Sequence, residues 1–133
     1  MIVMRRTTPA VILLGLACAG CAGSRGDAAE TAATRFAQAL QSQDGESACA
    51  ALAPATLEEL EQDEQQECAE AITAQELNDA GTAVGVDVFD GQARVRLEHD
   101  TYFLSRFDDG WRVVAAGCTP REGLPYDCTV KGG

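Results

Sequence analysis

Cysteine is the residue type in this 133-residue chain with the clearest covalent chemistry. A thiol can be acylated, oxidised to a disulfide or bound to a metal. Two cysteines lie near the start of the chain and four lie further along it: Cys18 and Cys21, then Cys49, Cys68, Cys118 and Cys128. The surroundings of the two groups differ, so they predict different chemistry.

The first twenty residues have the pattern of an export signal. Arg5 and Arg6 form a positive segment, and an uncharged, largely apolar run follows over 10–18. The uncharged stretch is only partly apolar and Pro9 interrupts it, which argues against a permanent membrane span. We therefore expect residues 1–20 to be a signal peptide that is removed on export.

The run Cys18-Ala19-Gly20-Cys21 resembles the bacterial lipobox, in which small residues precede a cysteine that receives a diacylglycerol thioether. The two residues before Cys21 fit this pattern, whereas Cys18 stands where Leu is usual. The resemblance implies that Cys21 is lipidated and that residues 21–27 form a tether to the extracytoplasmic face of the cell membrane. Ordinary signal cleavage near Ala22 is the alternative.

The four remaining cysteines predict two disulfides, because their number is even and the chain is exported. Three pairings are open, and we choose Cys49–Cys68 and Cys118–Cys128 because each pair is local in the sequence. Each bond should contribute about 3 kcal/mol to stability. A zinc site is the competing interpretation, but His99 is the only histidine and the spacing is wrong, so we expect no metal and no cofactor.

An acidic run lies between positions 58 and 70, where seven of thirteen residues are Asp or Glu. Such a run is usually a solvated helix face, and it can also dock a basic partner or bind cations weakly. We select Glu58, Glu61 and Glu64 as a candidate interaction face for a basic protein. The formal net charge of −11 argues against binding to nucleic acid, which requires a basic face.

Other polar residues fit structural roles better than catalytic ones. His99-Asp100 lies in an expected bend, where adjacent side chains point apart, so we expect a solvated turn. Arg94 and Arg96 share a strand face and can bind an anion together. Ion pairs with Asp87 and Glu98 are favoured, because Glu98 alternates onto the same face. Trp111 is expected to seal the sheet against the helices, with ligand stacking as the alternative.

Helices are expected in the acid-rich first half. Asp27 can cap a first helix, while Thr56 and Thr73 each begin a capping-box sequence. The first helix should present one apolar stripe at helical spacing: Ala29, Ala33, Phe36, Ala37 and Leu40.

Strands are expected from Ala83 onward. Asp90-Gly91 favours a two-residue hairpin turn. That turn predicts four cross-strand pairs: Val88 with Ala93, Asp87 with Arg94, Val86 with Val95 and Val84 with Leu97. A second hairpin joins strands over 101–107 and 111–117, and an irregular loop held by Cys128 should follow.

Helices followed by an antiparallel meander resemble the NTF2-like α+β cone, and cystatin-like folds share this order. The lipobox and the run over 107–118 resemble small uncharacterised lipoproteins of actinobacteria, a group that carries no assigned activity. We expect one α+β domain over 28–133, with N-terminal helices on a four-stranded antiparallel meander. We expect the protein to act as a non-enzymatic binding or interaction module of the cell envelope. The alternative is a small-molecule binder or enzyme with an NTF2-like pocket.

Overall fold

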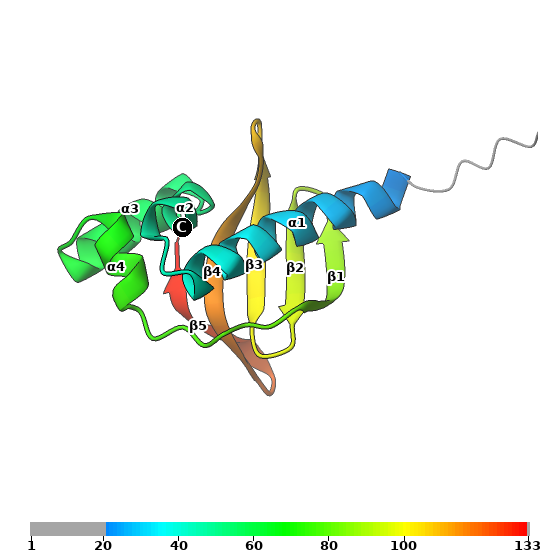
Figure 1. Cartoon of the computed structure of the whole chain (residues 1–133). Helices are drawn as coiled ribbons and strands as arrows, with labels where there is room; N and C mark the ends of the chain where they lie inside the picture. Colours follow the sequence, from blue (N-terminus) through cyan, green and yellow to red (C-terminus); the bar gives the residue numbers. More distant parts are fainter. Residues whose placement is uncertain (1–20, 133) are drawn as a thin grey trace, which may run out of the picture.

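The computed structural model describes residues 21–132, in which a helical half precedes a stranded half. Figure 1 shows α1 lying across one face of the sheet, with the other helices grouped beside β4 and β5. The elements are α1 Cys21–Gln41, α2 Gly45–Ala50, α3 Pro54–Glu64, α4 Cys68–Ala74, β1 Ala83–Phe89, β2 Gln92–Leu97, β3 Thr101–Phe107, β4 Gly110–Arg121 and β5 Leu124–Lys131. The five strands are antiparallel and follow chain order in the sheet. The α+β class is confirmed, and the expected four strands are corrected to five.

Helix α1 packs on the sheet through the predicted stripe, in which Ala29, Ala33 and Phe36 are fully buried. The ring of Phe36 meets the ring of Tyr102 edge-on, with 5.2 Å between centroids. The helix begins at Cys21, not at an Asp27 cap. Residues 21–27, the expected tether, are therefore part of this helix. The expected signal peptide, residues 1–20, lies outside the described residues.

Both predicted capping boxes are wrong. Helix α3 begins at Pro54, whose fixed φ suits the first helical position, so Thr56 lies inside the helix. The Thr56 hydroxyl is fully buried and donates to the Val114 carbonyl at 2.9 Å, which joins α3 to the sheet. Thr73 lies in the last turn of α4 and donates to the Ala69 carbonyl at 3.0 Å.

The first hairpin has the predicted turn, with Asp90 at a φ of 53°. Three predicted pairs are confirmed: Val88 with Ala93, Asp87 with Arg94, and Val86 with Val95. The fourth is wrong, because a register shift between Ala83 and Gly85 leaves Val84 62% exposed and places Ala83 opposite Leu97.

Strand β5 replaces the irregular loop that the sequence predicts after Cys118. Cys118 and Cys128 lie opposite each other in the β4–β5 register and form a disulfide. Pro125 is tolerated because β5 is an edge strand, where a missing N–H leaves no ladder bond unmade. The ring of Tyr126 meets the ring of Phe103 edge-on, on the sheet face opposite α1.

The space between α1 and the sheet is occupied by fully buried side chains. The largest of these on the helix and the central strands are Phe36, Tyr102, Leu104, Val95 and Val113.

Candidate functional site

The predicted disulfides are both present. Cys49–Cys68 joins α2 to α4 across a Cα–Cα distance of 6.1 Å, and Cys118–Cys128 joins β4 to β5 across 4.0 Å. Cys21, the predicted lipidation site, begins α1, but its side chain lies outside the described residues. Within residues 21–132, no helix has both the length and the apolar character needed to cross a membrane.

The three residues of the predicted acidic face have different environments in the structure. Glu61 is half-buried, and its carboxylate accepts a hydrogen bond from the Cys68 backbone N–H at 3.0 Å. This contact joins α3 to the start of α4, so Glu61 has a structural role. Glu58 and Glu64 are exposed.

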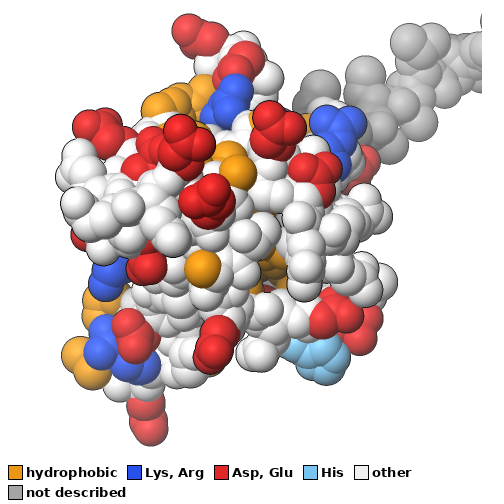
Figure 2. Space-filling view, turned by 60° about the vertical axis from the view of Figure 1, so that its left-hand side comes forward, with side chains coloured by type: hydrophobic (Ala, Val, Ile, Leu, Met, Phe, Trp, Pro, Cys, Tyr) orange, Lys and Arg blue, Asp and Glu red, His pale blue; other side chains and the backbone are white. Residues whose placement is uncertain are grey.

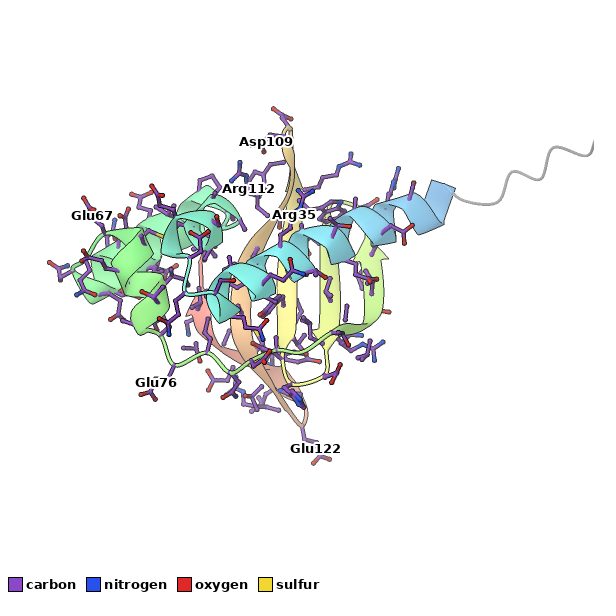
Figure 3. The ribbon with its side chains drawn as sticks, in the orientation of Figure 1. Arg35, Glu67, Glu76, Asp109, Arg112 and Glu122 are labelled. Atoms are coloured by element: carbon purple, nitrogen blue, oxygen red, sulfur yellow. A yellow bond between two sulfur atoms is a disulfide. The ribbon has the colours of Figure 1, made fainter. Side chains whose placement is uncertain are left out.

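We define the acidic surface by the other acidic residues of the run: Glu58, Glu59, Asp63, Glu64, Glu67 and Glu70. All except half-buried Glu59 are exposed. Figure 2, in which α3 and α4 come forward, shows Asp and Glu side chains scattered over this face. Glu67 lies at the end of the molecule farthest from the start of α1 (Figure 3).

A second candidate is a cleft of about 580 Å³ bounded by α1, α2 and the β3–β4 turn. We call it the α1–α2 cleft. Small side chains of the two helices leave the space open, and Trp111 forms the aromatic part of the wall. The charged and aromatic lining residues are Arg35 from α1, Asp44 at the N-cap of α2, and Asp109, Trp111 and Arg112 from the turn and β4. Figure 3 shows Arg35, Asp109 and Arg112 near one another at this end of the molecule.

The carboxylates that line the cleft already have partners. Asp44 accepts from the Ser47 backbone N–H at 3.1 Å and from the Ser47 hydroxyl at 2.6 Å. These two bonds hold the pKa of Asp44 below its ordinary value. Asp109 forms an ion pair with Arg112, and the hydrogen bond from Arg112 likewise lowers the pKa of Asp109. Both carboxylates are therefore charged and engaged at neutral pH.

The two arginines of the cleft differ. Arg112 also donates to the Ala50 carbonyl at 2.6 Å, so this side chain joins the β3–β4 turn to α2. Arg35 is exposed on α1, and its guanidinium has no hydrogen bond or ion pair with any other described residue. The cleft thus contains a cation that is available to a ligand.

No protein-family model, curated protein or solved structure matches this chain.

The other residues considered from the sequence have structural partners. Arg94 donates to the Asp87 carboxylate at 2.7 Å, which confirms that predicted pair. Arg96 also pairs with Asp87, at 3.8 Å between Nε and the carboxylate oxygen. The expected ion pair with Glu98 is wrong, because the Glu98 carboxylate accepts instead from the backbone N–H and the hydroxyl of Thr82. This difference follows from the register shift at the start of β1, which brings Thr82 beside Glu98.

His99-Asp100 is a turn, as predicted, but only His99 is exposed. The half-buried Asp100 carboxylate accepts the backbone N–H groups of Thr101, Gly117 and Cys118 at 2.7, 3.1 and 3.0 Å. Burial raises the pKa of Asp100, while these hydrogen bonds oppose the rise. Asp100 therefore holds the β2–β3 turn against β4.

Sequence reasoning did not find the α1–α2 cleft. Trp111 was expected to close the sheet against the helices, and it does pack against the buried core while also lining the cleft. Arg35 carried only a weak signal, since it is one of two basic residues among the many acidic ones between Cys21 and Asp90.

Proposed function

We propose that this protein is a lipid-anchored binding module on the extracytoplasmic face of the cell membrane, with the lipid on Cys21 and no catalytic role. The two disulfides support this proposal, because such bonds persist in oxidising compartments outside the cytoplasm. An NTF2-like fold is part of the same proposal, supported by the position of α1 across an antiparallel sheet (Figure 1).

The position of the anchor relative to the acidic surface also supports a binding role. Helix α1 has 21 residues, which corresponds to roughly 30 Å of length. Cys21 is the first residue of α1, and this end of the helix points away from α3 and α4 (Figure 1). A lipid at that end would leave the acidic surface directed away from the bilayer, where a partner can reach it.

The main support for a protein partner is that the exposed carboxylates of the acidic surface are held in a fixed arrangement. Cys49–Cys68 fixes α4 to α2, and Glu61 fixes α3 to α4, so the exposed carboxylates have a defined arrangement. Charges held in a fixed pattern favour association with a surface of the opposite sign, through faster encounter and selection against wrong partners. We infer that the partner is a protein with a basic patch.

Anchoring is tested by replacing Cys21 with Ser in the full-length protein expressed in its natural host. We expect the variant to leave the membrane fraction, whereas the control Cys18→Ser stays membrane-bound with a lipid-modified N-terminal peptide in mass spectrometry. Membrane retention of Cys21→Ser in lipid-free form would contradict the proposal.

The acidic surface is tested by cross-linking in membranes followed by identification of the captured protein. The variant Glu58→Gln/Glu64→Gln should lose capture of a partner that bears a basic patch. The control Glu30→Gln/Glu122→Gln makes the same change in charge at exposed positions on α1 and at the β4–β5 turn, and should retain capture. Equal capture by the two variants would contradict the assignment of this surface.

A further inference from the structure

The α1–α2 cleft has dimensions suited to a small molecule. Its volume of about 580 Å³ falls within the usual range for ligand sites, roughly 300–1,000 Å³. Its walls come from three separate segments of the chain, so a ligand within it would contact α1, α2 and the β3–β4 turn at once. Contacts to several elements allow a small molecule to be oriented.

The lining combines apolar side chains with polar and charged ones. Trp111 is half-buried, with its inner part against the core and its remaining surface on the cleft. Ala32, Ala39 and Ala51 supply further apolar area around it. A flat apolar group fits this lining, because it can lie against the indole ring without displacing a larger side chain.

The charges of the cleft select the sign of the ligand. Asp44 and Asp109 are engaged by Ser47 and Arg112, whereas the guanidinium of Arg35 is unpaired among the described residues. A ligand anion can therefore form a hydrogen-bonded ion pair with Arg35 without breaking an existing contact. The nearby carboxylates would repel a dianion, which favours a single negative charge.

We propose that the α1–α2 cleft binds a monocarboxylate that carries a flat apolar group, with the carboxylate on Arg35 and the apolar group against Trp111. The carboxylate can belong to a free organic acid or to the C-terminus of a peptide, because the recognised chemistry is the same. This site lies apart from the acidic surface and does not depend on that surface having a partner.

The test uses Trp111 as a reporter, since it is the only tryptophan in the chain and its fluorescence therefore reports on the cleft. The probes are 4-phenylbutyrate and acetyl-Ala-Ala-Phe with a free C-terminus, each compared with its uncharged amide. We expect the carboxylates to change Trp111 fluorescence in a saturable manner at concentrations up to about 10 mM, and the amides to bind at least about fivefold more weakly. Saturation by one carboxylate alone would support the site and identify the source of the ligand.

Two variants separate the cleft from general charge effects. Arg35→Gln should weaken binding of the carboxylate by about fivefold or more while leaving binding of the amide unchanged. The control Arg25→Gln removes the same charge from an exposed position on the same helix outside the cleft, and should bind as the parent does. Glu58→Gln/Glu64→Gln should also bind as the parent does, so the result is independent of the proposed partner.

Three outcomes would overturn the proposal: no saturable change with either carboxylate, equal affinity for acid and amide, or equal loss in Arg35→Gln and Arg25→Gln. Amide chemical shifts in NMR supply a second measurement. Ligand-induced shifts should centre on the second half of α1, on α2 and on the β3–β4 turn. Shifts confined to other regions would equally overturn the proposal.

Discussion

Replacing Tyr102 with Phe should stabilise this protein. The Tyr102 side chain is fully buried between α1 and the sheet, with its ring edge-on to Phe36. Its hydroxyl is also buried and has no hydrogen-bond partner among the described residues. Burial raises the pKa of Tyr102, and the carboxylates of Asp100 and Asp79 raise it further, so the buried group is a neutral hydroxyl.

The expected gain follows from the cost of that hydroxyl. Burying a hydroxyl without a hydrogen bond costs about 1–3 kcal/mol. Phe keeps the ring and its contact with Phe36, and it loses only the contacts that the oxygen makes. Because the removed atom leaves a small void, we expect a net gain near the lower end, about 1 kcal/mol. For a domain of this size, that corresponds to a rise in Tm of about 4 °C.

Urea unfolding of the disulfide-bonded protein measures this change directly. Tyr126→Phe is the matched control, since Tyr126 is half-buried on the opposite sheet face and its ring makes a similar edge contact, with Phe103 at 5.1 Å. The control should change the free energy of unfolding by less than about 0.5 kcal/mol. A loss of more than about 1 kcal/mol in Tyr102→Phe would refute the reasoning, because the hydroxyl would then contribute a hydrogen bond of ordinary strength.

Asp100→Asn should lower the free energy of unfolding at pH 7 by about 2 kcal/mol. The reason is that an amide nitrogen cannot accept a hydrogen bond from the backbone N–H groups that share the carboxylate in the parent. An unchanged midpoint of urea unfolding would contradict this. Replacing Cys49 and Cys68 together with Ser should cost about 3 kcal/mol, measured by calorimetry, since their bond closes a loop with a sequence separation of 19. Arg94→Gln should raise the pKa of Asp87 in an NMR titration, because the hydrogen bond from Arg94 is the main cause of its lowered pKa. In the parent, the stability that the charged Asp87 contributes is fully present above the ordinary carboxyl pKa, and it is lost as pH falls through the lowered pKa of the folded protein. The decrease in the free energy of unfolding over this pH range should therefore be smaller in Arg94→Gln.

The first hairpin was largely predictable because two independent signals agreed. Alternation of apolar residues requires one register, and the Asp90-Gly91 turn requires the same one. The error at Val84 had a signal beside it in Gly85, since a glycine within a strand often marks a bulge. The Arg96 guanidinium lies in the space that a β-carbon at this position would occupy, so the glycine leaves room for that side chain beside the register shift.

Strand β5 and the helix starts were missed because local signals were given too much weight. The segment after Cys118 was expected to be an irregular loop, yet Pro125 lies in β5, an edge strand, where proline is tolerated. The disulfide with Cys128 was itself evidence for a hairpin, because a cross-strand bond joins opposed residues. Thr56 had the spacing of a cap, but its hydroxyl bonds to β4, a contact that no local pattern can reveal.

The position of the α1–α2 cleft follows from the size of the side chains on α1. Ala29 and Ala33 let the helix lie close to the sheet, and Phe36 with Tyr102 fills the space between them. Where α1 ends, the chain turns into α2. The small side chains of both helices do not fill the space between these helices and Trp111. Alanine therefore has two effects: it lets α1 pack closely on the sheet at Ala29 and Ala33, and it leaves the α1–α2 cleft open at Ala32 and Ala39. A ligand site on this fold is therefore expected at the surface beside the β3–β4 turn.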